Sequence, residues 1–146
     1  MNSSSLRERS KTSKYHGLYW RHIDLLRSRG VKVYHRKLKN YNGFYNQRNK
    51  SITIKSNIAG TLLGLIIFLH ERSHLDHEIK KLYPSFYRKG KFDPIKDKKL
   101  IWAAEWNCFY RAKYVLNKLG INTSHSFVNK KWVKNNMLPM WIKEYC

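Results

Sequence analysis

The pattern of apolar and polar positions in the first third of the chain predicts one amphipathic helix followed by short strands. Apolar residues recur with helical spacing between residues 14 and 29, and Gly30 ends that predicted helix. Apolar and polar residues then alternate from Val31 to Tyr34 and again from Ser51 to Lys55, which predicts two strands. The Asn-rich stretch between them, which includes Asn42-Gly43, has the composition of turns. We therefore expect a helix followed by a small sheet.

The rest of the chain is predicted to be largely helical. Asn57 is a candidate N-cap for a long helix from Ile58 to about Leu82, whose first half is apolar on almost all sides and is expected to be buried. Asp93 and Pro94 are suited to start another long helix, which Gly120 ends. The segment after it is expected to add short helices. The predicted fold class is α+β, with a helix and a short sheet followed by two long antiparallel helices.

The length and the cysteine content limit the organisation. A chain of 146 residues with 42% hydrophobic residues fits one domain with a modest core. Two cysteines are too few for a disulfide framework and suggest a reducing compartment. Residues 1–13 offer almost nothing to bury, so we expect a flexible basic arm followed by one domain over residues 14–146. The longest apolar stretch, Ile58 to Leu69, is too short to span a bilayer.

The predicted central helix contains His70-Glu71-Arg72-Ser73-His74, which is the pattern H-E-x-x-H. Histidines four residues apart lie one above the other on a helix, so both imidazoles can bind one zinc ion. Glu71 then lies beside the first ligand and can act as general base toward a water on the open side of the metal. The alternative is that these three residues are solvated on a helix surface. Because an apolar helix ends directly at the motif, the motif is expected at the edge of the core, which favours the metal site.

A catalytic zinc site needs a third protein ligand, and Glu105 is the best candidate. With Trp102 and Phe109 it shares one face of the next predicted helix, where a carboxylate is costly unless a cation compensates it. That cation is either zinc or a lysine in an ion pair. His77 is a weaker candidate, because seven residues of helix place it about 10 Å from His70 along the axis. We expect His77 to lie behind the ligands or to face solvent.

This arrangement resembles the gluzincins, in which H-E-x-x-H is followed by a glutamate on the next long helix. The local sequence is similar in particular to the ImmA/IrrE-type metallopeptidases. The matching stretches, within residues 31–115, are Asn42-Gly43-Phe44-Tyr45, Ser51-Ile52-Thr53-Ile54, His70 to His74 and Glu105-Trp106-Asn107-Cys108-Phe109. The resemblance implies a small zincin-like domain in which His70, His74 and Glu105 bind zinc and Glu71 is the general base. SprT-like proteases are the runner-up family; they use a third histidine, for which His125 is the only downstream candidate.

A zincin-like site also implies a place for the substrate. In zincins the substrate backbone adds to an edge strand beside the metal, and Ser51 to Lys55 is our candidate for that strand. A group that stabilises the oxyanion is needed as well. Tyr110, Arg111 and His77 remain open candidates, and packing or solvation is the simpler interpretation of each.

The charge of the chain bears on its partners. Lys and Arg number 30 against 9 Asp and Glu, which gives a net charge of +21 and implies a polyanionic partner. Basic residues are crowded in residues 1–39, 80–99 and 130–134, and this wide spread favours contacts with nucleic-acid phosphates over base reading. Candidates for stacking on unpaired bases are Tyr15, Tyr19, Trp20 and Trp132. A solvating surface with no specific partner and an acidic protein substrate are the alternatives.

The sequence therefore predicts a zinc-dependent metallopeptidase that acts near nucleic acid and not at a membrane. The expected location is the cytoplasm of a bacterial cell or a phage-infected host, since a small chain rich in Lys, Asn and aromatic residues suits a phage. The rival hypothesis is a non-enzymatic basic protein that binds DNA or RNA and whose zinc site is structural or decayed.

Overall fold

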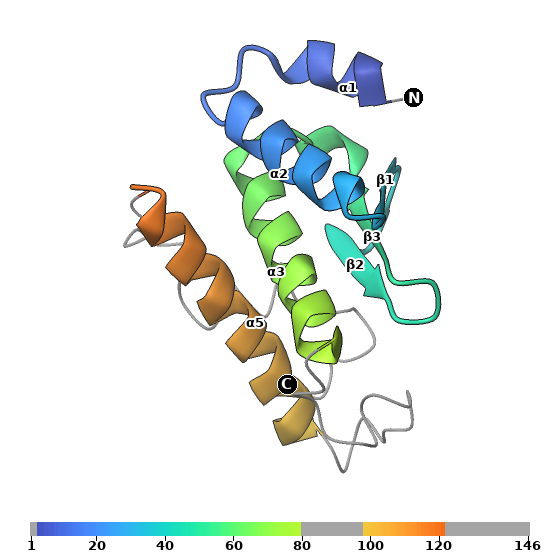
Figure 1. Ribbon diagram of the computed structural model, residues 1–146, viewed down its shortest axis with the longest axis vertical. Helices are drawn as coiled ribbons and strands as arrows, with labels where there is room; N and C mark the ends of the chain where they lie inside the picture. Colours follow the sequence, from blue (N-terminus) through green and yellow to red (C-terminus); the bar gives the residue numbers. More distant parts are fainter. Residues whose placement is uncertain (1–2, 80–97, 122–146) are drawn as a thin grey trace.

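The computed structural model describes residues 3–79 and 98–121, which form an α+β fold (Figure 1). The elements along the chain are α1 (Ser3–Ser10), α2 (His16–Ser28), β1 (Lys32–Arg36), β2 (Gly43–Asn46), β3 (Ser51–Lys55), the 3-10 helix η1 (Ser56–Ile58), α3 (Leu62–Ile79) and α5 (Lys98–Lys118). None of these helices has the length and apolar character needed to cross a membrane. The predicted helix start at Asp93-Pro94 and the segment after residue 121 lie outside the described residues.

The three strands form one mixed sheet in the order β1-β3-β2. β1 runs parallel to β3 with Val33 opposite Ile52, and β2 runs antiparallel to β3 with Tyr45 opposite the same residue. β3 has the bounds predicted from the sequence, but it is the central strand. Our expectation that Ser51 to Lys55 receives a substrate strand is therefore wrong, because both of its sides are already paired. Among the described strands, β1 and β2 form the edges of the sheet.

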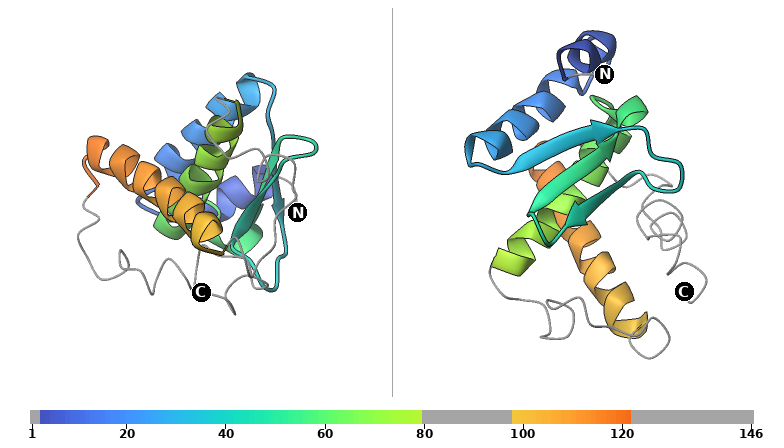
Figure 2. Two further views of the ribbon diagram at one scale, coloured as in Figure 1. Left: turned by 90° about the horizontal axis from the view of Figure 1, so that it is seen from below. Right: turned by 90° about the vertical axis from the view of Figure 1, so that its right-hand side faces the viewer.

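Helices α2, α3 and α5 lie on one side of the sheet, as both views in Figure 2 show. The core forms where this side of the sheet meets α2 and α3. Its largest fully buried apolar side chains come from α2, β3, α3 and α5, and they are Tyr19, Ile23, Ile52, Ile54, Leu65, Ile67, Phe68 and Leu116. The prediction that the apolar half of the central helix is buried is confirmed.

The predicted helix before the sheet is confirmed, and so is its end. α2 spans His16–Ser28, and Gly30 follows it with φ +86°, a conformation that glycine adopts without strain. The strand predicted from Val31 to Tyr34 is present as β1, one residue later at its start and two residues longer at its end.

The start of the central helix differs from the prediction. α3 begins at Leu62, not at Ile58, and Asn57 belongs to the 3-10 helix η1. Gly60 has φ +80°, which turns the chain between η1 and α3. Thr61 takes the capping role, because its hydroxyl oxygen accepts a hydrogen bond of 3.1 Å from the backbone N–H of Gly64. The apolar run of the sequence did not reveal this interruption.

Two further segments correct the sequence-based expectations. Residues 3–10 of the expected flexible arm form helix α1, because Leu6 is only 3% exposed and packs into the core while Arg7 pairs with Asp24. The expected turn around Asn42-Gly43 contains a strand, β2, that begins at Gly43. Glycine fits there because a Cβ would lie 2.7 Å from a methyl group of Ile67 and 2.9 Å from a carbonyl oxygen of β3.

Candidate metal centre

The two histidines of the H-E-x-x-H motif are held by the second half of α3. The first half of this helix is anchored by buried side chains such as Leu65 and Phe68. His70 and His74 lie one helical turn apart, so both rings project from the same face. Their rings are 4.8 Å apart between centroids. The motif therefore lies in the turns of α3 that directly follow its buried half.

Glu105 reaches the histidines from α5. Figure 1 shows α5 running alongside α3 in the opposite direction, as the sequence predicted. Phe109, Ala112 and Leu116 follow Glu105 along one stripe of α5, and all three are buried. This stripe packs α5 against the core and fixes the carboxylate at its end. The expected shared face of Glu105 and Phe109 is confirmed, whereas the side chain of Trp102 is outside the described part of the chain.

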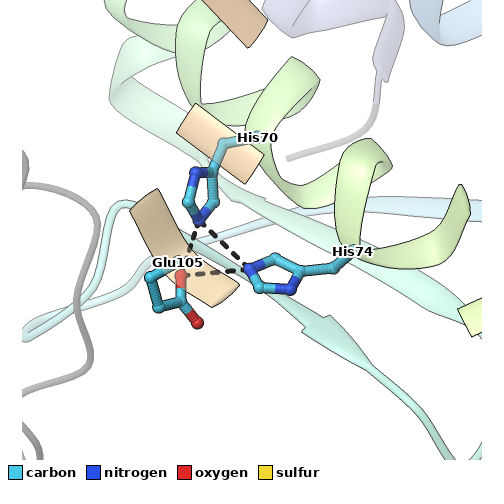
Figure 3. Close-up of side chains that lie close together, drawn as sticks. All are labelled: His70, His74 and Glu105. Carbon is cyan, nitrogen blue, oxygen red and sulfur yellow. Dashed lines mark hydrogen bonds and ion pairs between the residues drawn. The ribbon is translucent and has the colours of Figure 1, made fainter. Parts of the chain in front are cut away.

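The three side chains converge on a common point, as Figure 3 shows. Nε2 of His70 lies 2.7 Å from Oε2 of Glu105, and Nε2 of His74 lies 3.0 Å from the same oxygen. The two Nε2 atoms are 3.1 Å apart. The three residues are buried, with exposed fractions of 0% for His70, 5% for His74 and 6% for Glu105. A buried triangle of two imidazole nitrogens and one carboxylate oxygen can hold a metal ion.

The spacing of these donor atoms suits a small divalent ion. Bonds of about 2.0–2.2 Å in a tetrahedral zinc site place neighbouring ligand atoms about 3.3–3.5 Å apart. The observed separations of 2.7 to 3.1 Å are shorter by a few tenths of an ångström. Small side-chain rotations would therefore open the triangle enough to admit the ion.

The alternative explanation for a buried Glu105, an ion pair with lysine, is not what the structure contains. Within residues 3–79 and 98–121, the ion-pair partners of Glu105 are the two histidines, and no Lys or Arg pairs with it. Burial disfavours ionisation of Glu105, but the adjacent His74 and His70 more than offset this effect, so its pKa lies below the usual value. The carboxylate is thus the charged, metal-binding form.

Glu71 is buried beside the same cluster, and its environment differs from that of Glu105. Burial raises the pKa of Glu71 and the charge of Glu105 acts in the same direction, whereas His70 and His74 lower it. A hydrogen bond from the backbone N–H of Tyr45 also favours the ionised carboxylate. On balance, the pKa of Glu71 lies above its usual value.

The contact of Glu71 with Tyr45 was not anticipated from the sequence. Tyr45 belongs to the edge strand β2, so the backbone of this strand reaches the candidate base. The residue type does not indicate a main-chain hydrogen bond, because every residue except proline carries the same backbone N–H group. Only the pairing of β2 with β3 and its packing on α3 could have revealed it.

The other candidates for the site are not part of this buried cluster. Tyr110 is 51% exposed and its ring packs against Trp106 at 5.0 Å between centroids, and Arg111 is exposed as well. His77 lies within α3, but its side chain is outside the described part of the chain, and so is the whole of His125. The role of Tyr110 and Arg111 as oxyanion-stabilising residues stays a prediction.

Two of the aromatic residues that we expected to stack on bases, Tyr19 and Trp20, are placed differently. Tyr19 and Trp20 are buried in the core, so they cannot stack on a ligand at the surface. Their spacing on α2 puts them on its inner face, where Trp20 donates a hydrogen bond of 3.0 Å to the hydroxyl oxygen of Ser10. Tyr15 is partly buried, and Trp132 lies outside the described residues.

No protein-family model, curated protein or solved structure matches this chain. The chemistry of the site is therefore argued from its own geometry. Three convergent ligand atoms could hold a metal ion, and a buried glutamate with a raised pKa lies next to them.

Proposed function

We propose that this chain is a zinc-dependent metallopeptidase of the gluzincin type, in a small zincin-like domain. The observation that supports this most strongly is the convergence of His70 Nε2, His74 Nε2 and Glu105 Oε2 within 3.1 Å of one another. Two imidazoles and one carboxylate form a donor set that zinc uses in catalytic sites, with water in the fourth position. Zinc is therefore the metal that we assign to the site.

The residues around the donor set support a hydrolytic role. Bound zinc supplies Lewis acidity, which lowers the pKa of water and polarises a substrate carbonyl. Glu71 takes the proton of the attacking water and delivers it to the nitrogen of the leaving amine. The backbone N–H of Tyr45 holds the Glu71 carboxylate in place. The raised pKa of Glu71 makes it a stronger base than a solvated glutamate.

The sheet offers a place for the substrate. β2 pairs with β3 on one side only, so its other side is an edge among the described strands. An extended peptide can add to such an edge through main-chain hydrogen bonds. Because Tyr45 of β2 contacts Glu71, a peptide bound there would lie close to the base. In this proposal β2 takes the role that we had assigned to β3.

The resemblance to the ImmA/IrrE-type metallopeptidases is consistent with this arrangement and belongs to the proposal. A short sheet precedes the helix with H-E-x-x-H, and the next described helix contributes a glutamate to the cluster. A carboxylate in the third position supports a gluzincin over a SprT-like protease, whose third ligand is a histidine.

Metal analysis of matched variants tests the proposal. Protein purified without chelator is expected to contain one zinc ion per chain. His74→Ala removes a ligand and should lose the zinc, whereas Glu71→Gln should keep it. His22→Ala, which removes a histidine of α2 outside the cluster, is the control and should also keep it.

Peptide cleavage then tests the hydrolase activity separately from metal binding. Cleavage of a mixture of quenched fluorescent peptides is expected for the wild type and for His22→Ala, and neither for His74→Ala nor for Glu71→Gln. A wild-type protein without zinc would contradict the metal site. A wild-type protein that holds zinc but cleaves no better than Glu71→Gln would contradict the peptidase and favour the non-enzymatic rival.

A further inference from the structure

A basic groove lies at the ends of β1 and β3, away from the metal cluster. It has a cavity volume of about 590 Å³, and a neighbouring cavity of about 180 Å³ shares three of its lining residues. The polar residues that define the basic groove are Arg9, His35, Arg36, Lys37, Lys55, Ser56 and Asn57. Arg9, Ser56 and Asn57 are the shared residues, so the two cavities adjoin beside Arg9 of α1 and the residues of η1.

The parallel pairing of β1 with β3 brings positive charges together in this groove. Arg36 is the direct partner of Lys55 in the register of the two strands. Like charges directly opposite each other on neighbouring strands destabilise a sheet. Lys37 follows Arg36 and adds a third positive charge to the same wall. A bound anion would relieve the repulsion among the three.

No carboxylate of the described residues pairs with the cations at the strand ends of the basic groove. Neither cavity has an Asp or Glu among its lining residues, and within the described ranges no carboxylate pairs with Arg36, Lys37 or Lys55. The nearby acidic residues are used elsewhere, because Asp24 pairs with Arg7 and Glu8 pairs with Lys11. Within the described part of the chain, Arg36, Lys37 and Lys55 therefore keep their positive charges.

The basic groove is separate from the metal centre. It ends at η1, whereas His70 lies eight residues beyond the start of α3, about 12 Å further along the helix axis. Its volume is within the range of about 300–1,000 Å³ that is typical of ligand pockets, and the adjoining cavity extends it. Two adjoining cavities suit a chain of anions better than one small ion.

We propose that the basic groove binds the phosphodiester backbone of single-stranded nucleic acid. Arg, Lys, Ser and Asn are the side chains that contact phosphates and sugars in such complexes, and all four types line the groove. Positively charged grooves that follow the backbone are typical of proteins that bind single strands, and the volume of this groove lies in the range of ligand sites. The net charge of +21 adds long-range attraction for a polyanion. Sequence preference is not expected, because the groove offers contacts to the backbone.

The test compares two triple variants that lose the same charge. Arg36→Ala/Lys37→Ala/Lys55→Ala removes the groove cations. The control removes three exposed arginines outside the groove and is Arg21→Ala/Arg29→Ala/Arg111→Ala. Fluorescence anisotropy measures the binding of a labelled 12-nucleotide DNA, an RNA of the same sequence and a peptide of twelve glutamates, each at several salt concentrations.

The groove variant is expected to bind DNA and RNA at least tenfold more weakly than the wild type. The slope of log K against log salt should fall by about 2, since each lost phosphate contact on a single strand contributes about 0.7. The control should lose less than threefold. Similar binding of DNA and RNA supports the proposal, because both strands carry the same phosphodiester linkage.

Two results would overturn the proposal. Equal losses in the groove variant and the control would show that only overall charge matters, and glutamate peptide bound as tightly as DNA would show that phosphates are not selected. If the triple variant is not folded by circular dichroism, Lys37→Glu replaces it, because this side chain is exposed. That substitution should weaken binding at least fivefold, and unchanged binding would equally overturn the proposal.

Discussion

Acidification should weaken the fold through His35, and the size of the effect follows from its surroundings. Burial lowers the pKa of His35 from 6.5 to about 4, and the nearby Arg27 and Arg7 add to this shift. Nε2 of His35 lies 2.6 Å from the hydroxyl of Tyr19. Burial raises the pKa of Tyr19, so the hydroxyl keeps its proton and can donate it to the neutral imidazole. Protonation of His35 would remove this acceptor.

The expected magnitude comes from the difference between folded and unfolded pKa. A histidine with a pKa of about 4 when folded and 6.5 when unfolded binds more protons after unfolding at intermediate pH. Stability is then full above pH 6.5, falls as the pH drops toward 4 and levels off below it. At pH 5 the two pKa values correspond to a loss of about 2 kcal/mol in the free energy of unfolding. Solvent screening at the partly exposed ring reduces this loss to about 1 kcal/mol.

Urea unfolding at pH 7 and pH 5, in the presence of a chelator, measures this effect. His35→Gln keeps a hydrogen-bond acceptor for Tyr19 but does not titrate. The free energy of unfolding should fall by about 1 kcal/mol more in the wild type than in His35→Gln between the two pH values. All other titrating groups are common to both proteins and cancel in this comparison. Equal losses in the two proteins would refute the argument.

Two further predictions concern the central helix and the candidate base. Gly64→Ala should destabilise the protein by about 1–3 kcal/mol in thermal unfolding despite a better helix propensity, because the new Cβ would collide with the carbonyl oxygen of Ile58. The Cβ that Gly17→Ala adds in α2 has no atom within 4 Å, so this substitution should stabilise the protein by about 0.5–1 kcal/mol. Equal effects of the two substitutions would contradict the close contact of Gly64 with Ile58. Glu71→Gln should stabilise the metal-free protein at pH 7, because burial raises the pKa of Glu71 and ionisation costs folding energy. This gain in stability should disappear as the pH falls below 4.5, where Glu71 is protonated in both the folded and the unfolded protein. An unchanged or lower stability of Glu71→Gln at pH 7 would show that ionisation of Glu71 does not destabilise the fold.

The features that sequence predicted well are those with strong local signals. α2 has helical spacing and a glycine that ends it, and β3 alternates between apolar and polar residues. The candidate ligands were also predictable. Helix geometry alone places His70 above His74, and a carboxylate on the apolar face of the next helix needs a cation. The structure brings all three together, as the sequence led us to expect.

The features that sequence missed depend on contacts between distant segments. β2 has a turn-like composition and becomes a strand because β3 pairs with it. α1 is rich in basic residues, and it is held by Leu6 in the core and by the pair of Arg7 with Asp24. The position of β3 between two neighbours could not be read from its own residues. These tertiary contacts override local propensity, which is a weak guide for short elements.

The division of the ligands between two helices has a mechanical consequence. Among the described elements, α5 packs chiefly against α3, and Glu105 is its link to both histidines. An ion held by all three would cross-link the helices, and α5 could separate from the rest only by breaking a coordination bond. Occupancy of the centre would then set how often this helix opens, so amide hydrogen exchange along α5 would report metal binding from outside the site itself.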